Sequence, residues 1–198
     1  MKEESLQRAL DSLQTEVREL NNITKYLDRI AFGKAVDAIV RAKKVITSAS
    51  GASGIAAKKF AHTLCCIEKS SQFLSPCEAM HGGLGAVKEG DVMVMVSRGG
   101  KTAELFPIAE VCKKKKATLL IVTENIQTGL AQYADILLPM KIGMESDKYN
   151  VMATSSFLVT VAIFDAIICA VMEETDFTKE MFALIHPGGA VGARLNAR

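Results

Sequence analysis

Residues 92–102, VMVMVSRGGKT, decide the fold class of this chain. Five consecutive apolar residues suit a strand that is covered on both faces, which is typical of a parallel sheet. The strand runs into a glycine-rich turn, and a helical pattern follows from residue 102 to residue 115. This order of strand, loop and helix predicts a βα unit of an α/β protein.

The same order recurs along the chain and predicts five strands and their connecting helices. The expected strands are Val45–Ala49, Gln72–Ser75, Val92–Ser97, Thr118–Thr123 and Asp135–Pro139. The expected helices after residue 44 are Ser53–Ser70, Cys77–Val87, Thr102–Lys115, Ile126–Ala134, Met152–Glu174 and Lys179–Ile185. Right-handed crossovers then give a three-layer α/β/α sandwich with a five-stranded parallel sheet.

Two helices are expected before the first strand, within residues 1–43, because apolar residues recur there at helical spacing. The whole chain of 198 residues fits a single domain. A net charge of +2 and a pI near 8.2 disfavour a nucleic-acid partner. The charged N-terminal stretch and the absence of a long apolar run predict a cytoplasmic protein that has no membrane partner.

Neither a metal nor a cofactor is expected. The five cysteines are odd in number and show no paired spacing of a zinc site, so reduced and mostly buried thiols are expected. The glycine-rich turns match neither a dinucleotide-binding fingerprint nor a nucleotide-binding P-loop.

The loop after the first strand, residues 47–54, reads TSASGASG and leads into a helix. Hydroxyl groups and backbone amides at a helix N-terminus suit an anion, so Ser48 and Ser53 are candidate phosphate ligands. A purely structural turn with an N-cap serine explains the same residues, and this alternative stays open.

The loop after the third strand strengthens the phosphate interpretation. Ser97 and Thr102 can donate hydroxyl hydrogen bonds, and Arg98 and Lys101 add positive charge. Gly100 allows the backbone to approach a ligand closely. Two such loops at the carboxyl edge of one parallel sheet predict an anion site there.

Five segments in this order resemble the sugar isomerase (SIS) domain of the arabinose 5-phosphate isomerase family. They are GASG at residues 51–54, SPCEAMHGGLG at 75–85, SRGGKT at 97–102, ESDKYNVMATSS at 145–156 and IHPGGAVGARL at 185–195. The resemblance runs from about residue 30 to the end, and the second and last segments are the most specific. Members of the family commonly carry two additional CBS domains, so this chain looks like a stand-alone SIS version.

The resemblance implies an aldose–ketose isomerisation of a sugar phosphate through a cis-enediol, with Glu145 and His186 as catalytic residues. It also implies that the ring of His186 enters the site of a neighbouring subunit. The family pattern has a lysine in the first loop and a glutamate in the third-strand loop. This chain has Ala52 and Lys101 there, so the resemblance supports the ligand more firmly than the reaction.

Four other polar residues have two readings each. Glu78 and His81 are three residues apart on an expected helix, so they share a face and can contact sugar hydroxyls. His62 lies inside a helical pattern, where a surface or core position is the simpler explanation, and Glu104 suits the first turn of a helix without any function. A capping role is the alternative for His186.

Three functions stay open. The first is an arabinose 5-phosphate isomerase-like enzyme, and the second is a non-catalytic module that senses a sugar phosphate. The third is a 6-phospho-3-hexuloisomerase, which ranks lower because such enzymes normally lack the HPGGAVG ending. In each case the partner is a small sugar phosphate, and we expect a homo-dimer or homo-tetramer with sites near the subunit interfaces.

Overall fold

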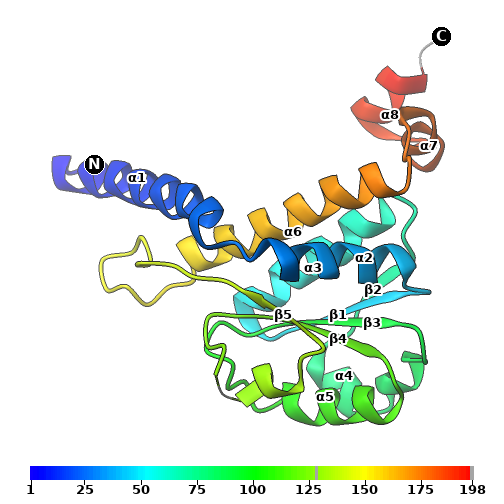
Figure 1. Ribbon diagram of the computed structural model, residues 1–198. Coiled ribbons are helices and arrows are strands. Elements are labelled where there is room, and N and C mark those ends of the chain that lie inside the picture. The colour runs from blue at the N-terminus through cyan, green and yellow to red at the C-terminus, as the bar shows by residue number, and fades with distance from the viewer. Residues whose placement is uncertain (128, 197–198) are drawn as a thin grey trace.

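The computed structural model describes residues 1–127 and 129–196 (Figure 1). Its five parallel strands form one sheet in the order β2-β1-β3-β4-β5. They are β1 (Val45–Ser48), β2 (Ser71–Phe73), β3 (Val92–Val96), β4 (Thr118–Thr123) and β5 (Ile136–Pro139). The predicted parallel α/β sheet is confirmed, and the strand ends agree with the predictions within two residues.

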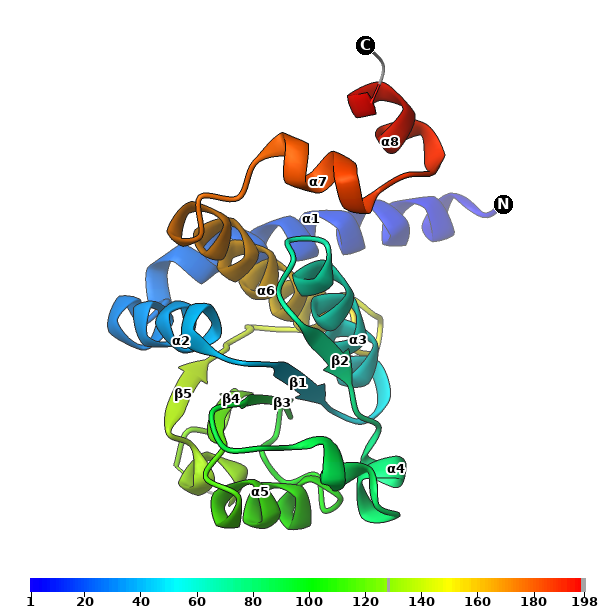
Figure 2. The ribbon, with the colours of Figure 1, turned by 90° about the vertical axis from the view of Figure 1, so that its right-hand side faces the viewer.

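Helices cover both faces of this sheet, as the apolar strands require (Figure 2). Successive side chains of a strand point to opposite faces. Accordingly, Val92, Val94 and Val96 belong to one buried cluster, and Met93 and Met95 belong to the other. The predicted three-layer sandwich is therefore present.

The helices on the first face of the sheet are longer than those on the second face. They are α2 (Arg29–Arg41), α3 (Gly51–Cys65) and α6 (Ser155–Glu174), and α1 (Glu3–Tyr26) packs on α6. Phe60 of α3 and Phe164 of α6 are both fully buried and stack with their ring centroids 4.1 Å apart. This stack joins the two helices at the centre of the larger cluster.

Helix α6 corrects one expectation, because by length and composition it is apolar enough to cross a membrane. Half of its most apolar stretch is buried inside the fold, where it contacts α1, α2 and α3. Core helices of soluble proteins can be equally long and apolar, so the length and composition of α6 are weak evidence for a membrane span.

The second face carries shorter helices than the sequence pattern predicts. They are α4 (Pro76–Met80), η1 (Gly83–Ala86), α5 (Leu105–Lys114) and η2 (Gly129–Tyr133). The single helix expected over residues 77–87 is broken at Gly82, whose φ of +106° is incompatible with a helix. The helix expected over residues 126–134 is only a short 3-10 turn, and α5 begins three residues later than expected.

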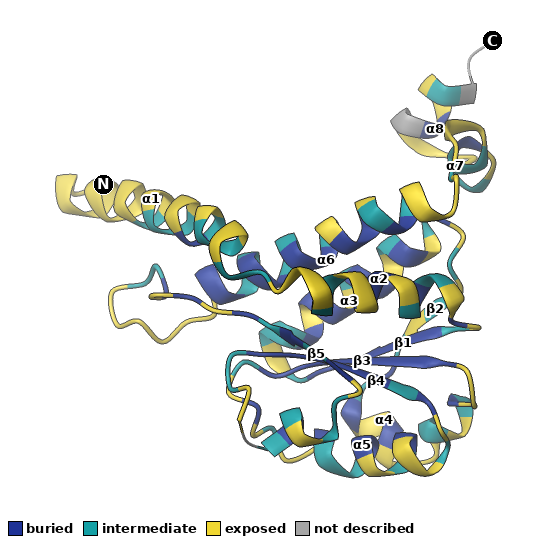
Figure 3. Ribbon diagram, in the orientation of Figure 1, coloured by how far each residue is buried: buried dark blue, intermediate teal, exposed yellow. Residues whose placement is uncertain are grey.

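The two ends of the chain extend away from the sandwich (Figures 1 and 3). Helix α1 exposes apolar side chains, namely Leu6, Leu10, Leu13 and Val17. At the other end, α7 (Lys179–Ile185) matches its predicted range, and α8 (Gly189–Asn196) was not predicted. Both terminal segments therefore present surface that the sandwich itself does not cover.

The aromatic stack gives a test of the core. Replacing Phe60 by Ala removes a fully buried ring and leaves a cavity beside Phe164, so we expect unfolding to become easier by about 3–5 kcal/mol. Ile55→Ala, on the exposed side of the same helix, is the control and should cost less than about 0.5 kcal/mol. Urea denaturation measures both values. Equal losses would show that the stack does not anchor α3 to α6.

Candidate functional site

The candidate site lies at the carboxyl edge of the sheet, where β1 and β3 are neighbours. The chain leaves β1 for α3 on one face and leaves β3 for α5 on the other. In a doubly wound sheet, this is the position at which the loops diverge and ligands bind. The two serine- and glycine-containing loops predicted from the sequence meet at this point.

The loop after β3 has the compact turn that its glycines predict. The hydroxyl groups of Ser97 and Thr102 lie 2.8 Å apart and hydrogen-bond to each other. Gly100 has a φ of +66°, and a β-carbon at that position would approach the hydroxyl oxygen of Thr123 to 3.2 Å. Lys101, the next residue, is exposed. Backbone amides, two hydroxyls and one cation are thus grouped at the end of β3.

The loop after β1 is only partly accessible. Ser48 is fully buried, and its hydroxyl has no hydrogen-bond partner among the described residues. Ser53 is half-buried in the first turn of α3, close to the positive end of the helix dipole. The structure therefore leaves Ser53 available to a ligand and places Ser48 beneath the surface.

The Arg98 side chain connects several segments of this edge. Its Nε donates to Oε2 of Glu124 at 3.0 Å, and its Nη1 donates to Oε1 of Glu145 at 2.6 Å. Glu124 directly follows β4, and its other oxygen accepts from the backbone amide of Ile142. One guanidinium therefore fixes the ends of β3 and β4 and the segment that follows β5.

The Glu145 carboxylate is enclosed, with only 1% of the residue exposed. Oε2 accepts hydrogen bonds from the amide and hydroxyl of Thr154 and from the amide of Ser156. Oε1 accepts from the Ser156 hydroxyl at 2.5 Å in addition to Arg98. Both oxygens are thus engaged in hydrogen bonds at the N-terminus of α6.

The segment between Glu145 and α6 is folded by a second carboxylate, that of Asp147. Loss of solvent raises the pKa of this group, but hydrogen bonds from the amides of Met152, Tyr149 and Val151 lower it by more, so that the net pKa lies below its ordinary value. The Ser146 hydroxyl also donates to Glu16 of α1. The loop that carries Glu145 is therefore held by its own turn and by α1.

Glu78 and His81 lie near this edge but do not form the predicted helical face. Helix α4 ends at Met80, so His81 is its C-terminal cap, and both side chains are exposed. His81 lines a pocket of about 590 Å³ together with Ser50 and Ser75. His81 thus stays within reach of a ligand at this edge, whereas Glu78 is not part of the pocket wall.

His186 lies far from the other candidate residues of its own chain. Helix α6 begins at the site and carries the chain about 30 Å away before α7 begins. The imidazole of His186 stacks on the Phe182 ring at 3.7 Å, and its Nδ1 lies 2.9 Å from the Phe182 carbonyl oxygen. Within one chain, His186 and Glu145 therefore cannot act on the same ligand.

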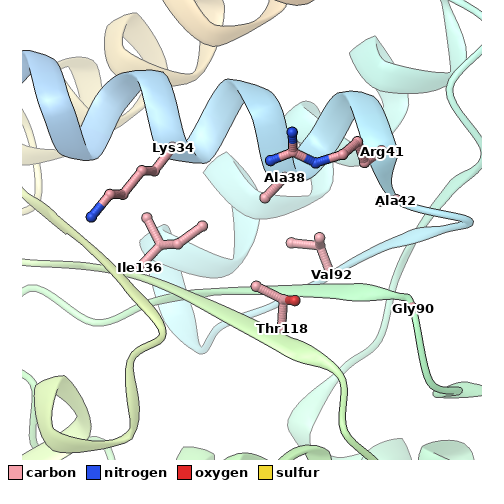
Figure 4. A pocket seen from close by; sticks show the side chains of 8 residues that line it. All are labelled: Lys34, Ala38, Arg41, Ala42, Gly90, Val92, Thr118 and Ile136. Atoms are coloured by element: carbon pink, nitrogen blue, oxygen red, sulfur yellow. The ribbon is translucent and has the colours of Figure 1, made fainter.

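A different pocket lies at the opposite, amino edge of the sheet (Figure 4). It has a volume of about 400 Å³ and lies between α2 and the first residues of β3, β4 and β5. Lys34 and Arg41 flank it, and Val92, Thr118 and Ile136 form its floor. None of the predicted site residues lines this pocket.

The sequence did not identify Glu124, Thr154 or Ser156 as parts of the site. Thr154 and Ser156 belong to the same quoted segment, 145–156, as Glu145. Their closeness to Glu145 in the sequence was the available signal that they could contact it. Glu124 had no such signal, because its partner Arg98 is 26 residues away. Within residues 1–127 and 129–196, no three histidine, cysteine, aspartate or glutamate side chains are grouped as metal ligands.

Two adjacent serines test the environment of Glu145. Ser156→Ala removes a hydrogen bond to a buried carboxylate, so we expect a loss of about 1.5–3 kcal/mol in unfolding free energy. Ser155 is equally buried but its hydroxyl has no partner among the described residues, so Ser155→Ala should be neutral or stabilising. Thermal and urea denaturation compare the two, and similar losses would contradict this hydrogen-bond assignment.

Comparison with solved structures agrees with this architecture. A Listeria monocytogenes protein described as a candidate sugar-phosphate isomerase superposes with a TM-score of 0.92 and 36% identity, over 95% of this chain and 100% of that one. An Escherichia coli CFT073 protein solved in complex with arabinose 5-phosphate superposes with a TM-score of 0.88 and 27% identity, over 94% of this chain and 100% of that one. The fold and its connections are thus shared with both.

Sequence comparison points to the same family. The arabinose 5-phosphate isomerase KdsD of Pseudomonas aeruginosa is 37% identical over 180 residues, which are 89% of this chain and 55% of the relative. The isomerase GutQ of Salmonella typhimurium is 35% identical over 185 residues, or 92% and 58%. The chain thus spans little more than half the length of these relatives. The SIS domain model matches residues 38–170, and the chain belongs to the SIS domain family.

Proposed function

We propose that this chain binds a sugar phosphate at the carboxyl edge of its sheet and interconverts its aldose and ketose forms through a cis-enediol, as an arabinose 5-phosphate isomerase does. The observation that carries the proposal is the pair of converging loops after β1 and β3. The names of the curated relatives and the arabinose 5-phosphate complex of the Escherichia coli structure support the substrate class.

The phosphate group is held by the turn after β3. The hydroxyls of Ser97 and Thr102 already bond to each other, so each can turn to donate to a phosphate oxygen. Gly100 keeps the backbone close, and Lys101 contributes an exposed positive charge. Ser53 faces the same edge from the start of α3.

The isomerisation moves a proton between two adjacent carbons and needs a group that stabilises the oxygen of the enediol. We assign one of the proton transfers to His186 of a second copy, because His186 of the same chain lies at the far end of α6. The remaining catalytic candidate, Glu145, is accessible to a substrate only if its present hydrogen bonds open.

The proposal includes a homo-dimer or homo-tetramer. The apolar side chains of Leu6, Leu10, Leu13 and Val17 are exposed along α1, and α7 and α8 also extend from the sandwich. Such surfaces are typical of contacts with another chain. In this proposal a second copy covers these surfaces and brings its His186 to the site.

A sugar-phosphate sensor without turnover is the second candidate function. Its support is specific: Ala52 and Lys101 stand where the family pattern has a lysine and a glutamate, and Glu145 is enclosed. Binding is common to both candidates, and only the enzyme exchanges a carbon-bound proton.

Ligand binding and proton exchange separate these functions. Arabinose 5-phosphate at 100 times its dissociation constant should stabilise the fold by about 2.7 kcal/mol in a thermal-shift assay. In D₂O, the enzyme should also incorporate deuterium at the carbon next to the carbonyl, as followed by NMR. Stabilisation without incorporation would identify the sensor. No stabilisation by pentose or hexose phosphates would overturn both.

The turn after β3 gives a second test. Thr102→Ala removes a hydroxyl that donates to the phosphate, so we expect binding of arabinose 5-phosphate to weaken by about 1–3 kcal/mol in calorimetry. Thr63→Ala is the control. It removes a partly buried hydroxyl on α3 that donates to the Lys59 carbonyl oxygen, and this variant should bind arabinose 5-phosphate as tightly as the wild type does. Unchanged affinity in Thr102→Ala would remove that residue from the site.

His186 gives a third test. His186→Asn should abolish turnover and deuterium incorporation while the affinity for arabinose 5-phosphate changes less than about threefold. Mixing this variant with Thr102→Ala, at an arabinose 5-phosphate concentration that leaves the Thr102→Ala sites mostly empty, should restore part of the activity, because some sites then combine an intact loop with an intact imidazole. Failure of the mixture to regain activity would contradict a site shared between two copies.

A further inference from the structure

A small cavity at the carboxyl edge is lined by the guanidinium of Arg98. Ala52 and Ser53 at the start of α3 form one wall, and Ser156 and Phe157 at the start of α6 form another. The centre of a water-sized group can occupy about 10 Å³ of it, which is enough for about one such group. The cavity therefore fits a single ligand oxygen and is too small for a phosphate.

The electrostatics of this cavity favour an oxygen that carries negative charge. The first turns of both α3 and α6 border it, and helix N-termini attract anions. The Glu145 carboxylate neutralises the α6 end, whereas the α3 end has no acidic residue in its first turn. Arg98 adds a guanidinium that is ion-paired with Glu124 and Glu145, and its side chain is 40% exposed.

Two carboxylates fix the orientation of the Arg98 guanidinium. Nε and Nη1 are bound by Glu124 and Glu145, and neither bond uses Nη2. Since a guanidinium is planar and rigid, two fixed nitrogens also fix the direction of the third. A donor held in this way needs no reorganisation when charge develops on a nearby oxygen, which is the arrangement that stabilises transition states best.

We propose that Arg98 binds the oxygen that becomes negatively charged in the cis-enediolate, and that Glu145 and Glu124 are positioning residues that aim its guanidinium. This inference rests on the proposed function and deepens it. Arg98 thereby supplies a guanidinium donor in a cavity that Ala52 also lines. Glu145 acts through Arg98 and does not itself take the proton from carbon.

Binding of two probes tests the role of Arg98 without requiring turnover. One is the hydroxamate of 4-phosphoerythronate, whose ionised oxygen mimics the enediolate, and the other is arabinitol 5-phosphate, which has no such oxygen. The wild type should bind the hydroxamate at least about 100-fold more tightly. Arg98→Gln should reduce this preference at least about tenfold, while the affinity for arabinitol 5-phosphate changes less than about threefold.

Two further variants serve as controls for effects of Arg98→Gln on stability. Arg98→Gln leaves Glu145 buried without its cation, so the double variant Arg98→Gln/Glu145→Gln, in which only the partly exposed Glu124 loses its ion pair, is measured beside it. Lys59→Gln removes a cation of similar exposure, whose ion pair with Asp165 joins α3 and α6, and should keep the full preference. An unchanged preference in the double variant would overturn the proposal.

A double-mutant cycle on kcat tests the role of Glu145. Arg98→Gln and Glu145→Gln should each lower kcat by about 100-fold or more, and the double variant should be no slower than the slower single variant. If the two losses in kcat multiply in the double variant, Glu145 does not act through Arg98. If Glu145→Gln loses all deuterium exchange while Arg98→Gln still exchanges, Glu145 is the base. A wild type that binds neither probe would instead refute the proposed function itself.

Discussion

The ion pairs of the Arg98 guanidinium with Glu124 and Glu145 are the interaction on which the carboxyl edge depends. Glu145 is almost fully buried, and an unpaired buried carboxylate costs several kcal/mol. The chain meets this cost with one cation, two hydroxyls and two backbone amides that belong to the end of β3 and the start of α6. The same contacts that satisfy the buried Glu145 carboxylate therefore also join the segments that form the site.

This arrangement explains why the two edges of the sheet differ. At the amino edge, the pocket of Figure 4 is flanked by Lys34 and Arg41, and the ion pair of Arg41 is with Asp37 on its own helix, at 3.6 Å. Such an exposed pair contributes little stability and holds no other segment. At the carboxyl edge, the charged groups come from separate segments, and Glu145 is enclosed. Preorganised charge of this kind is what a reaction with a charged intermediate requires.

Much of the fold could be predicted because buried strands such as VMVMV are recognisable from a short run of apolar residues. The helices over residues 77–87 and 126–134 were predicted too long, since propensity cannot reveal a φ of +106° at Gly82. That the loops after β1 and β3 lie at one edge of the sheet could be predicted, because the edge is a property of the topology. The pairing of Arg98 with Glu145 spans 47 residues and depends on packing, so the sequence could not reveal that this carboxylate is enclosed by hydrogen bonds.

The path of α6 determines what a single chain can do. Its first turn, with Ser155 and Ser156, is part of the site, and its other end leads to α7 and His186 about 30 Å away. A rigid helix whose core-facing side is buried against α1, α2 and α3 cannot bend to bring these ends together. If both ends act on one substrate, the imidazole comes from another copy, and the exposed apolar side of α1 offers the surface for that copy. Assembly and catalysis are then two consequences of the same long helix.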